Sequence, residues 1–186
     1  MFLCIVLVLF FLQLGVKVDF CQAIEFDKNT NSTTQHQNDA LKFYEKSISL
    51  YKLAASEITL AENETDRKKI QPLLEEAIKN AEKAIELNSK DSEAFYHLGR
   101  CLLELSKLET GENKKQLLYE AQKKCEQAIK LDENNADAFY TWSDCLMELA
   151  DGEKDPLEKK VLLEKARAKH QEATRLTAIR LGFGKN

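Results

Sequence analysis

The chain has 186 residues, of which 44% are hydrophobic and 31% are charged, and its formal net charge is −4. This is the composition of an ordinary globular domain, and a mildly acidic chain without a basic stripe excludes a nucleic-acid-binding surface. Only two Pro and six Gly occur, while Glu, Lys, Leu and Ala are abundant, so the composition predicts an all-α fold.

The first 23 residues differ from the rest of the chain. Residues 2–12, FLCIVLVLFFL, are apolar without a break, and Lys17 follows a few positions later. The run is shorter than the ~20 residues that span a bilayer and suits the core of a signal peptide. Cleavage after Cys21-Gln22-Ala23 would place the chain in the secretory pathway, as a secreted or lumenal protein. The alternative is that residues 1–23 are an uncleaved N-terminal membrane anchor.

A polar stretch follows this segment. Residues 27–39, DKNTNSTTQHQND, contain no apolar side chain, so residues 24–39 are predicted to be a flexible linker. Asn31 and Asn63 each begin an Asn-x-Ser/Thr triplet and are candidates for glycosylation if the chain enters a secretory lumen.

The remainder of the chain is repetitive. Residues 82–105 and 126–149 are identical at 11 of 24 aligned positions, 44 residues apart. A Leu-Leu pair shortly before an alanine occurs three times, at 73–77, 117–121 and 162–166. Self-similarity at a regular spacing indicates stacked supersecondary units.

Within a unit the apolar residues recur with helical spacing. Phe95, Leu98, Leu102 and Leu105 share one face of a helix, and the same face returns 44 residues later. One helical hairpin cannot bury its own apolar faces, so hairpins must stack. The predicted domain is 40–181, with hairpins at about 40–88, 91–132 and 135–181 and a tail at 182–186.

The last helix has clear end signals. It is predicted to run from Pro156 to about Leu181 and to stop at Gly182. Asp155 suits the N-cap, and Glu158 would complete a capping box with it.

The units resemble the tetratricopeptide repeat. The residues that carry the resemblance are Ala94, Phe95, Leu98 and Gly99 in a first helix and Ala121, Ala128, Ile129, Leu131 and Asp132 in a second. The units are longer than the family's usual length of about 34 residues, and Glu133 stands where a proline is common. The long units also loosely resemble the mitochondrial import receptor of plants, whose anchor lies at the other end of its chain.

The resemblance implies a right-handed α-α superhelix of three hairpins whose concave groove binds a protein or peptide partner. The residues predicted to line that groove are Tyr51, Tyr96, Arg100, Leu103, Tyr140, Asp144 and Met147. The tyrosines offer apolar area with a polar tip, or, alternatively, they only pack one unit against the next. Arg100 and Asp144 occupy equivalent positions and are expected to pair with each other; the alternative is that each binds a ligand.

Some proteins of this class clamp the acidic C-terminus of a chaperone with Lys, Asn and Arg side chains. The matching positions here are Tyr51, Ala55, His97, Asp137 and Thr141. The resemblance therefore implies no binding of that tail.

Catalytic and metal-binding signals are missing from the sequence. No nucleophile elbow, phosphate loop or metal-ligand spacing occurs, so we expect no enzyme activity, cofactor or metal. Cys101, Cys125 and Cys145 are predicted to be small buried side chains without a disulfide, and His170 an inner-face residue of the last unit.

The predicted function is that of a non-enzymatic adaptor or scaffold targeted to a membrane-bounded compartment. Two alternatives differ in location and assembly: a membrane-anchored receptor or assembly factor, and a homo-oligomer formed by end-to-end stacking of the uncapped array.

Overall fold

The computed structural model of the chain describes residues 20–58 and 64–183, and places the side chains of residues 32–55 and 67–183. These residues form α2 (Phe20–Ile58), α3 (Glu64–Leu87), α4 (Ser92–Ser106), α5 (Gly111–Leu131), α6 (Ala136–Gly152) and α7 (Pro156–Arg180). The prediction of an all-α fold is confirmed. Residues 1–19, which hold most of the predicted signal or anchor, and Asn63 lie outside the described residues.

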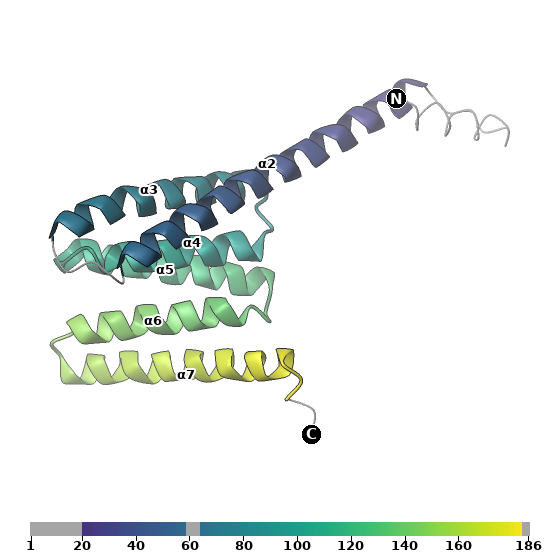
Figure 1. Ribbon diagram of the computed structural model, residues 1–186. Coiled ribbons are helices and arrows are strands. Elements are labelled where there is room, and N and C mark those ends of the chain that lie inside the picture. The colour runs from purple at the N-terminus through teal and green to yellow at the C-terminus, as the bar shows by residue number, and fades with distance from the viewer. Residues whose placement is uncertain (1–19, 59–63, 184–186) are drawn as a thin grey trace.

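The helices pack as three neighbouring pairs. α2 packs on α3, α4 on α5 and α6 on α7, and the pairs follow one another in chain order down the molecule (Figure 1). The first pair begins at Phe20, earlier in the sequence than the predicted hairpin at about 40–88. The right-handed superhelical arrangement stays a prediction.

The predicted flexible linker is wrong, because residues 24–39 belong to α2. No Pro or Gly occurs between Phe20 and Ile58, so no residue in this stretch forces the helix to end. The N-terminal part of α2 projects beyond the paired helices (Figure 1), and residues 32–38 are exposed. These exposed residues extend a helix whose later part packs on α3, so they do not need an apolar face to remain helical.

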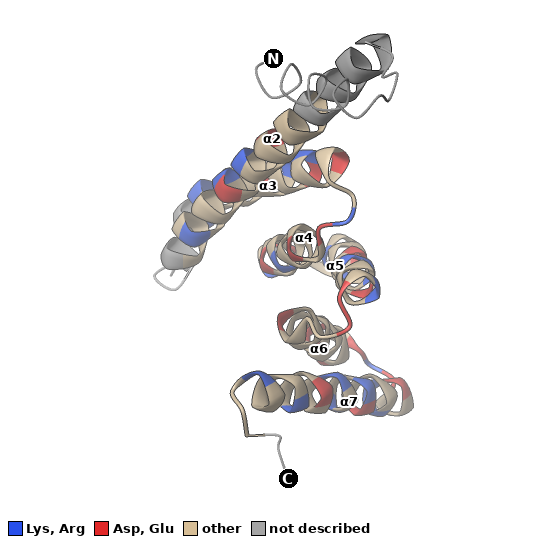
Figure 2. Ribbon diagram, turned by 90° about the vertical axis from the view of Figure 1, so that its right-hand side faces the viewer, with Lys and Arg blue, Asp and Glu red and all other residues tan. Residues whose placement is uncertain are grey.

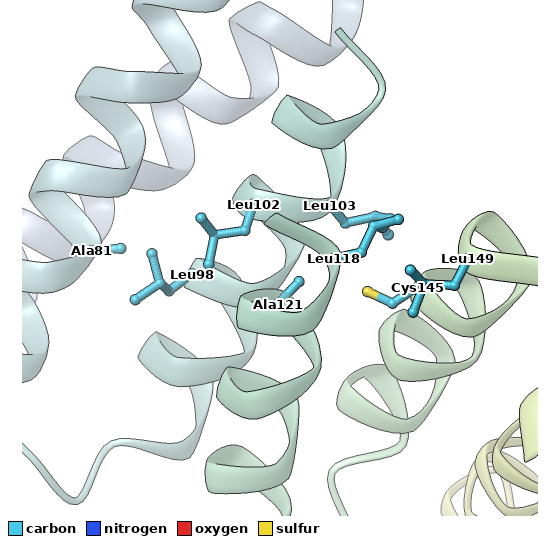
Figure 3. Packing of buried hydrophobic residues seen from close by; sticks show 8 residues of the cluster. All are labelled: Ala81, Leu98, Leu102, Leu103, Leu118, Ala121, Cys145 and Leu149. Carbon is cyan, nitrogen blue, oxygen red and sulfur yellow. The ribbon is translucent and has the colours of Figure 1, made fainter. Parts of the chain in front are cut away.

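The central core joins units that are far apart in the sequence. Its buried side chains come from α3, α4, α5 and α6 and meet between the helices (Figure 3). They are Ala81, Leu98, Leu102, Leu103, Leu118, Ala121, Cys145 and Leu149. Small and large side chains alternate here, which brings the helices close enough to exclude water.

Two hydrogen bonds define the alignment of the units. The Ser143 hydroxyl of α6 donates to the Ala166 carbonyl at 2.9 Å, and the Ser47 hydroxyl of α2 donates to the Ala77 carbonyl at 2.7 Å. Ala77 and Ala166 are equivalent alanines of the repeat, so Ser47 is equivalent to Ser143 and to Gly99. The paired residues are 30 positions apart in the first unit and 23 in the third. The packed part of α2 therefore lies earlier in the sequence than expected if every unit were 44 residues long.

Gly99 lies at a close contact between α4 and α5. A Cβ at this position would lie 2.9 Å from the Cys125 sulfur and 3.1 Å from the Ala121 carbonyl oxygen. In the third unit a serine fits at the equivalent position, where the residue matching Cys125 is His170 and is exposed. The buried Cys125 thiol leaves no room for a side chain at position 99. The backbone conformation of Gly99 does not by itself require glycine.

We expect Gly99→Ala to lower the free energy of unfolding by about 1–2 kcal/mol, because the new methyl group overpacks this contact. Urea denaturation followed by circular dichroism measures the change. In a Cys125→Ala background the same substitution should cost less, since the sulfur is gone. An equal cost in both backgrounds would mean that the Ala121 carbonyl alone limits the approach.

The ends of α7 follow the predicted signals with one exception. Asp155 caps the helix by accepting a hydrogen bond from the Leu157 N–H at 2.8 Å, and Gly182 has a φ of 81° at the other end. The predicted capping box with Glu158 is wrong. The Asp155 N–H donates instead to the carboxylate of Glu153 at 3.0 Å, which lies before the helix.

Candidate protein-binding surface

A row of tyrosines follows the first helix of each pair. The alignment through Ser47 makes Tyr44, and not Tyr51, the equivalent of Tyr96 and Tyr140. All three are half-buried. The signal for this correction was present in the sequence as a repeated Phe-Tyr dipeptide at 43–44, 95–96 and 139–140.

Tyr51 has a different role from the predicted one. Only 6% of it is exposed, and it belongs to a core cluster with residues of α3 and α4. The Arg100 guanidinium lies 4.7 Å from the centre of its ring, and the same guanidinium donates a hydrogen bond to the Tyr96 hydroxyl at 2.9 Å. Arg100 therefore contacts two tyrosines. The predicted ion pair between Arg100 and Asp144 is wrong.

His97 lies beneath this group of aromatic residues. It is 4% exposed, and its ring meets the edges of Tyr44 and Tyr51 at centroid distances of 5.7 Å and 5.4 Å. Burial lowers the pKa of His97 to about 4, and a backbone hydrogen bond with Ser47 opposes part of that shift. The imidazole is neutral at physiological pH and serves as a packing residue.

Leu103 does not line a groove. It is 3% exposed and belongs to the central core. Of the residues predicted for the concave side, Tyr96, Arg100, Tyr140, Asp144 and Met147 are the ones that reach the surface at least in part.

Around Met147 the surface is hollowed. The hollow has a volume of about 410 Å³. It is lined by Ser143 and Met147 of α6 and by Leu163, Ala166, Arg167, His170 and Gln171 of α7. Met147 and Leu163 are 41% and 42% exposed, so both present apolar surface to solvent. We call this the Met147 hollow. The sequence predicted Met147 of α6 for the groove and His170 of α7 for the inner face, and both line this hollow.

Tyr140 and Asp144 border this region on α6. The Tyr140 ring meets the edge of His170 at 5.2 Å, and its hydroxyl lies 3.3 Å from the Thr174 hydroxyl. Partial burial raises the pKa of the exposed Asp144 carboxyl, while the charges of Lys107 and His170 oppose the shift. Asp144 thus lies close to the Met147 hollow, on the same helix as Met147 and near His170 of α7.

Neighbouring carboxylates differ from Asp144 in having basic partners. Glu148 pairs with Lys114 at 2.6 Å, and Glu104 pairs with Lys107 at 2.8 Å. Within the described part of the chain, Asp144 has no ion-pair partner. It is available to a positively charged ligand.

Cys101, Cys125 and Cys145 are buried and free. Burial raises the pKa of the Cys101 and Cys125 thiols to about 12, so neither is a nucleophile. Among the residues that the structure describes, no group of His, Cys, Asp and Glu could hold a metal ion.

Within residues 20–58 and 64–183, no helix combines the length and the apolar character needed to cross a membrane.

Paired helices that expose aromatic, apolar and charged side chains are suited to binding another protein. The sequence model of the family described as plant-specific mitochondrial import receptor subunit TOM20 matches residues 66–177. The chain belongs to this family. The match begins in the first turn of α3, includes α4, α5 and α6, and ends at Thr177 in α7. No curated protein matches the chain at a significant level.

Family membership corrects two predictions. A secretory signal peptide and a secreted or lumenal location are wrong, because the family consists of mitochondrial import receptors. Glycosylation at Asn31 and Asn63 depended on that location and loses its basis. The loose resemblance to the plant import receptor is confirmed, because the chain belongs to that family. The predicted protein-binding role is confirmed as that of an import receptor family.

Proposed function

We propose that the chain is a receptor of mitochondrial protein import that binds the targeting segments of precursor proteins at the Met147 hollow. Family membership supplies the class of protein. The alternative of an uncleaved anchor at residues 1–23 would hold the receptor at the mitochondrial membrane, with the helical pairs outside the bilayer. The observation that carries the choice of surface is an apolar hollow bordered by the carboxylate of Asp144.

The chemistry of the ligand matches this surface. Mitochondrial targeting segments are amphipathic and rich in Arg, with few acidic residues. The apolar face of such a helix would lie on Met147 and Leu163, as amphipathic helices do in apolar grooves. An arginine of the ligand would pair with Asp144. Arg167, on the α7 wall, would repel basic side chains and so orient the ligand's charged side toward α6.

Binding of a labelled amphipathic peptide of leucines and arginines, measured by fluorescence anisotropy, tests the proposal. We expect Met147→Glu to weaken binding by about tenfold or more, because it places a charge in the apolar contact. Asp144→Lys should weaken it by a similar factor and reduce its dependence on salt.

Glu133→Lys is the control, since it makes the same change of charge at an exposed site after α5. The proposal fails if Glu133→Lys weakens binding as much as Asp144→Lys does, or if Met147→Glu has no effect.

A further inference from the structure

A second hollow lies on the other side of the α6–α7 pair. It has a volume of about 370 Å³ and is formed by α5, α6 and α7. Trp142 and Leu146 of α6, Gln122 of α5 and Leu162 of α7 line it, with Lys165 and Lys169 of α7 among the remaining lining residues. On α6, Trp142 and Leu146 each precede by one residue the Ser143 and Met147 of the other hollow. We call this second feature the Trp142 hollow.

The equivalent position in the preceding unit is filled by apolar side chains. One unit earlier, between α3, α4 and α5, the equivalent side chains are Ile78, Leu98, Leu102 and Leu117, and all of them pack in the central core. Gln122 replaces Ile78, and Trp142 replaces Leu98, each 44 residues further on. The Trp142 hollow is thus a junction between units at which two of the core residues have been changed.

Gln122 leaves a donor unused inside the junction. Its side-chain oxygen accepts a hydrogen bond from the Trp142 indole N–H at 3.2 Å. The Nε2 of the same amide is buried and has no hydrogen-bond partner in the described part of the chain. Buried donors are nearly always satisfied in folded proteins, so an acceptor group of a ligand would complete the hydrogen bonding of this amide.

Two lysines of α7 lie at the rim, and the carboxylates of Glu126 and Glu172 act on Lys169 from outside the lining. The Lys169 ammonium lies 3.6 Å from the centre of the Trp142 ring and 5.5 Å from that of Phe139. Lys165 is exposed and stands where the preceding unit has Glu120. Among the residues described, neither lysine forms an ion pair, and Glu158 is the one carboxylate that lines the hollow.

We propose that the Trp142 hollow is a second protein-binding site, which takes an acidic segment of a partner protein that carries a large apolar side chain. The apolar side chain packs on Trp142 and Leu146. The segment's carboxylates pair with Lys165 and Lys169, and one of its oxygens accepts from the Gln122 amide. This site requires the opposite charge from the Met147 hollow, so it does not depend on the proposed function.

Trp142 makes the site directly observable, because it is the only tryptophan of the chain. The 186-residue chain in neutral detergent is titrated with a blocked peptide in which a Leu-Phe pair is flanked on each side by two aspartates, and Trp142 emission is recorded. We expect a saturable change. Peptides with lysines in place of the aspartates, or serines in place of the Leu-Phe pair, should bind at least about tenfold more weakly.

Two substitutions copy the preceding unit. Gln122→Ile fills the hollow as Ile78 does, and Lys165→Glu introduces the charge of Glu120. Each should weaken binding of the acidic peptide by about tenfold with circular dichroism unchanged. Lys90→Glu, at an exposed site before α4, is the charge-matched control and should have no effect.

Three results would overturn the proposal. One is the absence of a saturable emission change, and another is equal binding of the aspartate and lysine peptides. The third is an emission change that depends on the concentration of the chain without peptide, which would assign the hollow to a second copy.

Discussion

Leu118→Ala should lower the free energy of unfolding by about 3–4 kcal/mol. Leu118 is 1% exposed and lies in the central core, where it meets side chains of α4 and α6 (Figure 3). Removal of three buried carbon atoms loses their transfer free energy and leaves a cavity that surrounding helices fill only in part. Urea denaturation followed by far-UV circular dichroism measures the loss.

The matched control is the same substitution one unit later. Leu163 is equivalent to Leu118 but is 42% exposed, because no further helical pair among the described residues covers α7. Leu163→Ala should cost less than about 1 kcal/mol and should weaken targeting-peptide binding at the Met147 hollow. Equal destabilisation by the two substitutions would show that α7 is covered in solution, as end-to-end stacking of copies would require.

Stability should fall below pH 6.5 as His97 becomes protonated in the unfolded chain. The pKa of His97 is about 4 in the fold against the ordinary value of 6.5, and its first cause is burial. Between these values the unfolded state binds more protons, so the free energy of unfolding rises with pH. The stabilisation is complete above pH 6.5 and is lost as the pH falls toward 4. A difference of about 2.5 units corresponds to roughly 3 kcal/mol.

The measurement is the free energy of unfolding at pH values from 7 to 4 for the chain and for His97→Asn. The difference between the two profiles isolates His97 from the carboxylates that also titrate in this range. His36→Asn serves as control, since His36 is exposed on α2. Parallel profiles for the chain and His97→Asn would mean that His97 is accessible to protons in the folded state.

The two hollows give the α6–α7 pair two faces of different character. Met147 lies on one side near the carboxylate of Asp144, and Trp142 lies on the other below the ammonium of Lys169. Blue and red residues alternate along α7 (Figure 2), so no single charge dominates the helix as a whole. Under the two proposals, specificity depends on which charged side chains border each hollow, and two partners of opposite charge would occupy separate faces of this helical pair.

The sequence predicted the helices because their signals are local. The apolar spacing of Phe95 to Leu105, the Asp155-Pro156 start of α7 and its end before Gly182 each depend on residues within a few turns. The Leu-Leu and alanine pattern identified the second helix of every pair, and the tetratricopeptide resemblance led to a protein-binding role. These inferences needed no knowledge of which residues meet across the fold.

Contacts between distant residues were decided by the tertiary structure alone. A regular spacing of 44 to 45 residues placed Tyr51 in the tyrosine row. The Ser47–Ala77 hydrogen bond instead aligns Tyr44 with that row, and Tyr51 is buried. Leu103 lies in the core, and Arg100 packs on Tyr51, because neighbouring helices cover those positions. The repeat determines which residues are equivalent in sequence. Whether an equivalent residue is buried depends on whether a neighbouring helix covers it. That is why Leu118 is a core residue while its equivalent Leu163 is available to a ligand.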